Sequence, residues 1–424
     1  MQANIAKGLH EWAGHHGGQR SLVRPVVCAP NLLVRWACYL SAFAIPFSQL
    51  YLPGTGERIG ATRVVQFLMF AAIISQPRVC LRFVPVALFW FVAYAALRII
   101  WGFWFAPELF AVWWPSSLHW LQFSLPWLWL MFNVLQFPKI SRRVLWALVW
   151  GCSLCALLHI GGIGTEVVGA ADEGRSSVFG ENANVIGSDY AIALIVLIGL
   201  GMFHDTKLSS RLLIIPLTCV VGIGLAKTGS RTGILLVVLG VIILLFQAGS
   251  VASRVQRYSI LLLAGLVLAA VIYQMPTVMK RFATVNSSAM REQEPRARML
   301  PVLWEIFLRS PIYGSGPDQY QFELTRRAMP YLVREQKTIS AHNLLLLLLV
   351  ETGAIGLFLF AFGLKEAMIA AWRGRHGRGW LPLAMIAPLV IAGATCSNPS
   401  SSGIFWLAIA YALSGCEGTS NINP

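Results

Sequence analysis

Charged side chains are scarce in this sequence: Asp, Glu, Lys and Arg make up only 12% of its 424 residues, while 57% of the residues are hydrophobic. A water-soluble domain of this length does not hide so much apolar surface in one core. The mean hydropathy of +0.65 agrees with this reasoning. These values exclude an ordinary soluble enzyme and predict an all-α polytopic membrane protein.

Acidic residues are the rarer charged residues, with 18 Asp and Glu against 33 Lys and Arg, which gives a net charge of +15. In a membrane protein this excess is typical of cytoplasmic loops and of contact with anionic headgroups. The basic residues do not alternate with aromatic residues as they do on nucleic-acid platforms. The sequence therefore predicts membrane lipids as partners and no nucleic acid.

Motifs for metals and nucleotides are also missing. No cluster of His, Cys and carboxylates has the spacing of metal ligands, and no P-loop or dinucleotide motif appears. Cys152 and Cys155 form a C-x-x-C, but they lie in a predicted span without His or acidic neighbours. We interpret them as small buried apolar residues. The sequence predicts chemistry without a metal or a cofactor.

Hydropathy divides the chain into four parts. Residues 1–31 lack the apolar core of a signal peptide and predict a cytoplasmic tail. Because a membrane-crossing helix needs about 20 apolar residues, we expect about twelve: nine within 32–275 and three within 341–424, with a periplasmic loop at 276–340. The predicted spans begin near Leu32, Thr62, Phe83, Leu118, Val144, Val185, Leu212, Gly233, Ser259, Ala341, Leu381 and Gly403.

Lys and Arg are divided unevenly between alternate loops, and this asymmetry sets the orientation. With the N-terminus in the cytoplasm, the cytoplasmic loops hold most of the cations. They are Arg78 and Arg82; Lys139, Arg142 and Arg143; Lys207 and Arg211; Arg254 and Arg257; Lys365, Arg373, Arg375 and Arg378. An even number of spans returns the C-terminus to the cytoplasm.

The segment 276–340 is too long and too basic for an ordinary connection. Within it, "MLPVLWEIFL" has apolar residues at helical spacing, "YGSGPDQY" is a turn sequence, and "QFELTRRAMPYLV" predicts a second amphipathic helix. Long outside loops escape the charge rule, so these cations do not reverse the orientation. We expect a partly helical cap against the outer leaflet, between spans 9 and 10.

Three groups of residues converge on the predicted outer face. The first is "AKTGSRTGIL" at 226–235, a tight turn that holds Lys227 and Arg231 at the membrane boundary. Lys227 fits an interface anchor, with contact to a substrate as the alternative. Arg231 favours a substrate anion, because a guanidinium group binds two phosphate oxygens at once.

The second group lies at the beginning of the cap, where Arg291, Arg296 and Arg298 precede an apolar helix. Cations at the start of a helix oppose its dipole, and a bound anion would remove that conflict. Glu292 and Glu294 offer local ion pairs as the alternative. Arg298, nearest the apolar helix, is our candidate for contact with a substrate anion.

The third group opens the run "AHNLLLLLLVETGAIGLFLF". At about 100° per residue, His342 and Gly353 lie on one face of a helix, so that a neighbouring helix can approach beneath the histidine. Glu351 lies on the opposite face, about 13 Å deeper, and we expect it to bond to polar groups of another span. His342 is left at the water boundary as a candidate general base, with Asn343 as a candidate substrate contact.

A further polar stretch, "FGENANVIGSDYA", runs from an outside loop into a span. We expect Asn182 and Asn184 to contact the substrate. Asp189, an acid inside a span, is a functional candidate that would share their cavity, while packing against Ser or Tyr groups explains it equally well.

Cations and a candidate base at the outer leaflet suit a membrane-embedded substrate with a diphosphate headgroup. The arginines would stabilise the charge that develops on a departing diphosphate. His342 would accept the proton of an attacking hydroxyl group.

At these residues the sequence resembles the O-antigen ligase and polymerase superfamily of bacterial envelopes. The resemblance rests on "FGENAN", on "SRTG" at 230–233, on P-x-x-G-x-G at 311–316 and on "AHNLLLLLLVETGAIGL" at 341–357, in that order around one large outside loop. It covers about residues 175–365, while the first five spans are similar only in hydropathy.

The resemblance implies a GT-C-like glycosyltransferase that inverts the sugar without a metal or a nucleotide sugar. Its donor would be a glycan on polyprenyl (undecaprenyl) diphosphate, and its active site would face the periplasm from the bacterial inner membrane. By motif match, His342 is the base, and Arg231 and Arg298 contact the diphosphate. Arg298 lies further from the tryptophan of the cap helix than the family pattern has it, so Arg296 or Arg291 fits that role as well.

Three acceptors fit the superfamily. A ligase moves the glycan to a lipid A–core sugar, a polymerase extends a second lipid-linked glycan, and a protein O-oligosaccharyltransferase modifies Ser or Thr. The single large outside loop and the end of the chain at Pro424 favour the ligase. A transporter of lipid-linked glycans is the alternative of another class, although transporters usually show repeat symmetry and charges within several spans.

Overall fold

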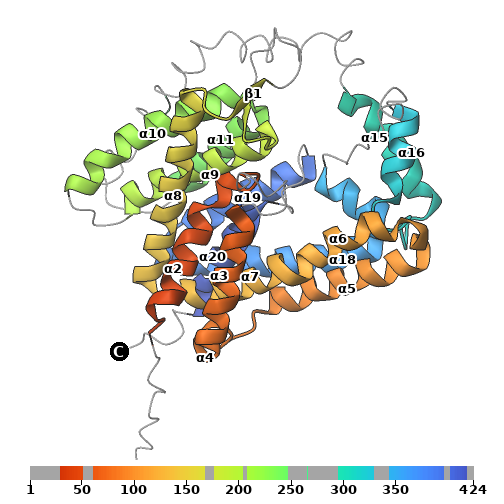
Figure 1. The fold of residues 1–424 in the computed structure, drawn as a ribbon, viewed down its shortest axis with the longest axis horizontal. Coiled ribbons are helices and arrows are strands. Elements are labelled where there is room, and N and C mark those ends of the chain that lie inside the picture. The colour runs from red at the N-terminus through yellow and green to blue at the C-terminus, as the bar shows by residue number, and fades with distance from the viewer. Residues whose placement is uncertain are drawn as a thin grey trace, which may run out of the picture.

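The structure, a computed structural model, describes residues 29–50, 61–167, 176–203, 208–246, 265, 295–328, 343–395 and 402–417. This part of the chain is almost entirely helical (Figure 1). Its α-helices are α2 (Leu32–Phe43), α3 (Ala61–Ser75), α4 (Pro77–Cys80), α5 (Val86–Phe105), α6 (Phe110–His119), α7 (Leu125–Leu135), α8 (Pro138–Ile160), α9 (Ala183–Phe203), α10 (Leu208–Thr228), α11 (Arg231–Leu245), α15 (Pro295–Arg309), α16 (Gln319–Ala328), α18 (Leu344–Arg378), α19 (Leu381–Thr395) and α20 (Gly403–Glu417).

Short elements complete the described part. They are the 3₁₀ turns η1 (Ile45–Phe47) and η2 (Pro107–Leu109), and the π-helical turn η3 (Trp120–Ser124) between α6 and α7. The strands β1 (Thr165–Val167) and β2 (Ser176–Val178) form one antiparallel pair, with Thr165 opposite Val178.

Four helices in the described residues are long and apolar enough to cross a membrane: Val86–Phe105, Pro138–Ile160, Ala183–Gly201 and Leu344–Arg378. Shorter apolar helices are Leu32–Phe43, Val64–Ser75, Leu212–Thr228, Arg231–Leu245, Leu381–Ala394 and Gly403–Gly415. These helices confirm an all-α membrane protein. The total of about twelve spans stays a prediction, and the span expected near Ser259 lies outside the described residues except for Gly265.

Helix α9 lies in the centre of the bundle. It packs against α8, α10, α11 and α19, and 83% of its apolar stretch is buried. A helix that is apolar on all sides belongs in a core, and the sequence "AIALIVLIGL" has no polar face to turn outward. Helix α18 packs in turn against α5, α19 and α20.

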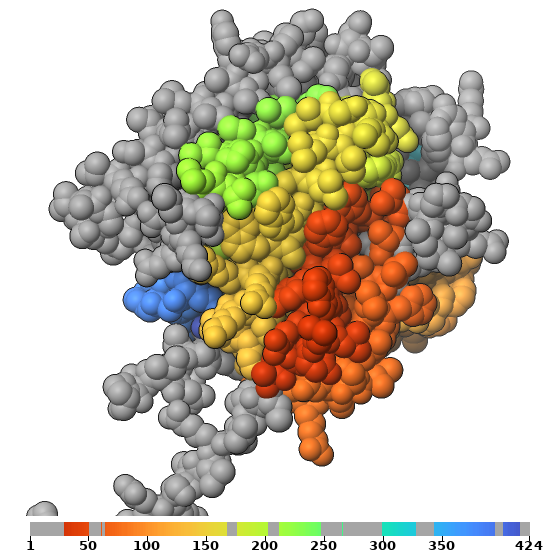
Figure 2. Space-filling model, turned by 60° about the vertical axis from the view of Figure 1, so that its left-hand side comes forward, coloured from red at the N-terminus to blue at the C-terminus, as the bar shows by residue number. Residues whose placement is uncertain are grey.

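The outer helices expose apolar side chains instead. Helix α2 packs against α3 and α8, and all three lie on the face seen in Figure 2. Their exposed apolar residues include Trp36, Phe67, Ile74, Trp150 and Leu157. Large apolar side chains exposed on several outer helices of a bundle suit contact with lipid.

The cations before the span expected near Val144 lie in a helix rather than in a loop. Helix α8 begins at Pro138, so Lys139, Arg142 and Arg143 belong to its first turns. Proline is favoured at the first helical position because its missing N–H would have no helical partner there. These cations therefore lie in helical turns ahead of the predicted span, and the position of the membrane boundary stays a prediction.

The predicted cytoplasmic loop at 365–380 is also largely helical. Helix α18 continues to Arg378, and Gly379 follows it with φ 70°. Its ψ is −164°, and this backbone conformation is essentially restricted to glycine. The cations of this segment thus lie along the last turns of α18.

The predicted cap contains the two helices that its sequence predicts, α15 and α16, joined by a turn (Figure 1). Their apolar sides pack together and against Val350 of α18, in a cluster that also holds Met299, Val302, Leu303, Ile306, Tyr320 and Leu324. On their polar sides Arg327 donates to Glu305, and this hydrogen bond holds the pKa of the Glu305 carboxyl below its usual range. The placement of this cap outside the membrane stays a prediction.

Gly353 interrupts α18 within the motif that follows His342. Its backbone has φ 65° and ψ −161°, a conformation essentially restricted to glycine. The backbone of the turn after α15 fills the space beside it, because a Cβ on Gly353 would lie 2.2 Å from the carbonyl oxygen of Ile312. The expectation of a continuous helix with a neighbouring helix on its glycine face is therefore wrong. A turn occupies that face, and the helix breaks to receive it.

Gly353→Ala should destabilise the protein by about 1–3 kcal/mol, because alanine would be strained at this φ. The contact of its Cβ with the carbonyl oxygen of Ile312 should add to this loss. Thermal unfolding in detergent measures the loss. Gly222→Ala in α10 is the matched control, since no atom lies within 4 Å of the added Cβ outside its own helix. Equal midpoints for the two variants would contradict the strain at Gly353.

Candidate functional site

The turn between α10 and α11 holds Arg231 at the first position of α11. Gly229 turns the chain with φ 58°, and Ser230 caps the new helix by accepting the N–H of Gly233 at 3.2 Å. Arg231 is half-buried. A cation in the first turn of a helix opposes its dipole, so a bound anion would stabilise this arrangement.

Close packing of α9 on α11 brings Asn184 to this turn. A Cβ on Gly187 would lie 2.6 Å from the Cβ of Ser230, and a Cβ on Gly233 would lie 2.7 Å from the carbonyl oxygen of Gly187. Both positions therefore need glycine. The hydroxyl of Ser230 donates to Oδ1 of Asn184 at 3.3 Å. The structure thus joins two sequence candidates, Asn184 and Arg231, through Ser230.

The two other polar candidates on this helix have structural partners. Asn182 is exposed, and its Oδ1 accepts the N–H of Asn184 at 2.9 Å, where α9 begins. Asp189 is buried, and the hydroxyl of Ser402 donates to its Oδ1 at 3.5 Å. Asp189 therefore lies in the core with a serine partner, while Asn182 lies at the surface.

Lys227 caps the end of a neighbouring helix. Its Nζ donates to the carbonyl oxygens of His159 at 3.3 Å and Ile160 at 3.0 Å, which are the last residues of α8. Cations near a helix C-terminus bind such carbonyls and complement the dipole. This contact favours the interpretation of Lys227 as an anchor over a substrate contact.

Asn343 fixes the beginning of α18. Its Oδ1 accepts the N–H of Leu346 at 3.0 Å, and its Nδ2 donates to the carbonyl oxygen of Ala394 at 2.9 Å, near the end of α19. His342, the preceding residue, lies outside the described residues. Asn343 thus holds the chain directly after His342, and its contact with a substrate stays a prediction.

Helix directions place Arg231 and Asn343 at the same end of the bundle. The end of α11 meets the beginning of α19, where the ring centroids of Phe246 and Trp380 are 5.9 Å apart. Because the two helices pack along each other, their other ends, at Arg231 and Ala394, also lie together. Asn343 joins this end through its bond to Ala394.

Helix α15 lies along the first turns of α18. Its apolar side packs against Val350 and against the partly buried Leu346. Arg296 and Arg298 belong to its first turns, but their side chains and all of Arg291 lie outside the described residues. The structure therefore brings the helix that carries two candidate arginines next to the helix that follows His342.

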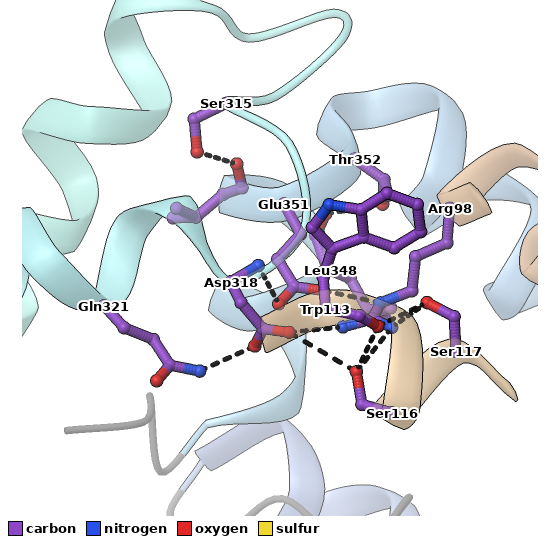
Figure 3. A network of polar contacts seen from close by, with 11 residues as sticks. Arg98, Trp113, Ser116, Ser117, Ser315, Asp318, Gln321, Leu348, Glu351 and Thr352 are labelled. Atoms are coloured by element: carbon purple, nitrogen blue, oxygen red, sulfur yellow. Dashed lines mark hydrogen bonds and ion pairs between the residues drawn. The ribbon is translucent and has the colours of Figure 1, made fainter. Parts of the chain in front are cut away.

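A buried ion-pair network joins the cap turn to three other helices (Figure 3). Arg98 on α5 donates to Asp318 in that turn and to Glu351 on α18, both at 3.1 Å. Its Nη1 also donates to the hydroxyls of Ser116 at 3.0 Å and Ser117 at 2.6 Å on α6. Arg98 is only 7% exposed, so the network lies in a low-dielectric interior. A polar group without a hydrogen-bond partner there costs free energy of folding.

Glu351 fixes the cap turn in several ways. Its Oε1 accepts the N–H of Asp318 at 3.1 Å, and its carbonyl oxygen accepts the N–H of Gly316 at 3.0 Å. The N–H of Ser315 donates to the preceding carbonyl, that of Val350, at 2.8 Å. The expectation that Glu351 bonds to polar groups of another span is confirmed by its contact with Arg98, and Asp318 of the cap turn belongs to the same network.

Sequence reasoning does not single out Arg98. The available signal is one arginine in the apolar run "VAYAALRIIW", because a charge within a span needs a partner. Its carboxylate partners lie 220 and 253 residues away in sequence. A local pattern therefore predicts that a partner exists without identifying it.

Arg98→Ala should destabilise the protein by about 3–5 kcal/mol, because it leaves two buried carboxylates without their cation. Thermal unfolding in detergent is the measurement. The control is Arg309→Ala, which removes an exposed ion pair with Glu323 and should cost no more than about 1 kcal/mol. Similar losses for the two variants would show that the buried network contributes no more than a surface pair.

In the described part of the chain, no three His, Cys, Asp or Glu side chains gather closely enough to hold a metal ion. No curated protein matches the chain. Residues 216–361 match the family described as O-antigen ligase. The matched segment contains the Arg231 turn, the cap helices, the beginning of α18 and the Gly353 break. In this segment the chain is similar to the O-antigen ligase family, as its motifs imply.

Proposed function

We propose that the protein is an O-antigen ligase. It transfers a glycan from an undecaprenyl diphosphate carrier to a hydroxyl group of a lipid A–core sugar. The observation that carries the proposal is the meeting of the Arg231 turn with the beginning of α18, along which α15 lies. The family match supports glycan transfer between lipid-linked substrates in general.

The candidate arginines and His342 have separate roles in this proposed reaction. Arg231 and Arg298 bind the diphosphate, with Arg291 or Arg296 as a further contact, and their positive charge stabilises the charge that forms as it leaves. The acceptor oxygen attacks the anomeric carbon on the face opposite the diphosphate. The bond from that carbon to the diphosphate oxygen breaks, and His342 takes the proton of the acceptor hydroxyl. This displacement inverts the anomeric carbon.

The proposed location is the bacterial inner membrane, with both termini in the cytoplasm and Arg231 facing the periplasm. In a Cys-free variant, Ser287→Cys should therefore react with a membrane-impermeant maleimide in intact cells, and Ser253→Cys only after permeabilisation. The physical basis is the excess of Lys and Arg in alternate loops. The reverse labelling pattern would invert the topology.

Deletion of the gene tests the proposed function in cells. A strain without the ligase should leave lipid A–core without glycan and accumulate the lipid-linked glycan on the outer leaflet of the inner membrane. Accumulation on the inner leaflet would instead indicate a transporter. A lipid A–core that carries only one glycan unit would indicate a polymerase. Unchanged lipid A–core with an unglycosylated protein would indicate a protein O-oligosaccharyltransferase.

A further inference from the structure

A basic cavity lies at the opposite end of the bundle from Arg231. It has a volume of about 350 Å³ and lies between the beginning of α8 and the end of α18. Its lining includes Ser141, Arg142, Arg375, His376, Arg378 and Tyr411. Both helices reach the candidate site with their other ends, since α8 ends at the Lys227 contact and α18 begins at Asn343.

Arg378 is held in place by neutral groups. Its Nη1 donates to the hydroxyl of Ser414 at 2.7 Å, and its Nη2 donates to the carbonyl oxygen of Leu135 at 2.7 Å. Its guanidinium lies 5.2 Å from the ring centroid of Tyr411. These contacts orient the cation toward the cavity wall without neutralising its charge.

Arg375 and Arg142 add two more cations to this cavity. Arg375 donates to the carbonyl oxygen of Trp372 at 2.6 Å and stacks on the ring of Trp372 at 4.2 Å. Among the described residues, the ion pairs of the structure involve other arginines, and the cavity lining contains no carboxylate. Three arginines from two helices therefore share one cavity, and no described side chain balances their charge.

Two ordinary explanations account for only part of this arrangement. Arg375 and Arg378 complement the negative end of the α18 dipole, but Arg142 lies in the first turns of α8, where it opposes the dipole. The charge asymmetry of the loops requires cations on the predicted cytoplasmic side, but it does not require three of them to line one cavity. Converging like charges repel each other, and an anion between them would remove the repulsion.

Tryptophans place this cavity at the level of lipid headgroups. Trp372 is 49% exposed and packs edge to face against Trp380, with ring centroids 5.4 Å apart. Tryptophan favours the boundary between water and hydrocarbon. The exposed apolar residues of α8, such as Trp150 and Leu157, begin a few turns along the same helix. A ligand with a phosphate in the cavity would thus have apolar surface beside it for acyl chains.

We propose that this cavity binds the phosphate group of an anionic phospholipid from the leaflet opposite the candidate active site. One guanidinium group can bind two oxygens of a phosphate, and basic pockets between membrane helices suit acidic headgroups. The site is separate from the transfer reaction, and it stands whether or not the protein is a ligase.

Binding of phosphatidylglycerol in competition with phosphatidylcholine of the same acyl chains tests the proposal. The lipids are offered to the full-length protein in neutral detergent, and native mass spectrometry measures the lipid retained. Wild-type protein should retain phosphatidylglycerol, and Arg142→Ala/Arg375→Ala should weaken that binding by about tenfold or more. The control Arg143→Ala/Arg373→Ala removes the same charge from exposed neighbours outside the cavity lining and should bind normally.

Three results would overturn the proposal. Equal losses in the two double variants would show that net charge alone attracts the lipid. If inorganic phosphate bound to the protein and this binding also depended on Arg142 and Arg375, the ligand of the cavity would be a soluble anion and not a lipid. A gain of binding in Glu417→Gln would identify that carboxyl, at the end of α20, as the counter-ion of the arginines. The proposal expects no effect of phosphate and unchanged binding in Glu417→Gln.

Discussion

His342→Ala should fold normally and lose about a hundredfold or more of its rate of glycan transfer. General-base help is worth about two to four orders of magnitude. An unperturbed histidine has a pKa of about 6.5, so a large neutral fraction is present near neutral pH. Transfer from purified lipid-linked donor to lipid A–core in detergent gives the rate, and a melting curve of the same sample reports folding.

Asn343→Ala provides the contrast that separates chemistry from structure at this position. It removes the cap of α18 and the bond to Ala394, so it should lower the melting midpoint. His342→Ala should leave that midpoint near the wild-type value. A folded His342→Ala variant that transfers at more than about a tenth of the normal rate would remove the base assignment, since the expected loss is larger.

Arg231→Lys should lose about a hundredfold of the transfer rate while remaining folded. Lysine keeps the charge but not the planar pair of donors that binds two phosphate oxygens, and loss of one well-placed donor to a developing anion costs about two to three orders of magnitude. The cap of α11 belongs to Ser230, so the substitution leaves the turn intact.

Lys227→Arg is the matched control on the same turn. Its side chain donates to the last carbonyls of α8, and an arginine can make the same contact. Transfer by this variant should be close to normal. If Arg231→Lys were equally silent at normal membrane levels, Arg231 would be an interface anchor and the diphosphate contact would have to come from the cap arginines.

The helical parts of this fold could be predicted where the signal is local. Apolar length predicts most of the apolar helices in the described residues, and apolar spacing predicts α15 and α16 on either side of a glycine-containing turn. The break at Gly353 could not be predicted in this way. The same glycine pattern fits a helix that a neighbouring helix approaches, and only the backbone of Ile312 shows that a turn occupies the space.

The sequence predicts which residue types belong to the candidate site, but not which contacts those side chains make in the fold. Asn343 and Lys227 have the chemistry of substrate contacts, and in the structure each also completes the hydrogen bonding of a helix end. A capping side chain and a binding side chain look alike in a single sequence. Arg98 was missed for another reason, since its partners Asp318 and Glu351 are brought to it by the fold and not by spacing.

As an O-antigen ligase, the protein itself would join glycan to lipid A–core. Purified full-length protein in detergent, given only a glycan on undecaprenyl diphosphate and lipid A–core, should form the glycosylated lipid A–core. Each transfer should release one undecaprenyl diphosphate and invert the configuration of the transferred anomeric carbon. A folded protein that binds the donor but releases no diphosphate, or that lengthens the donor glycan and leaves lipid A–core unmodified, would contradict the claim.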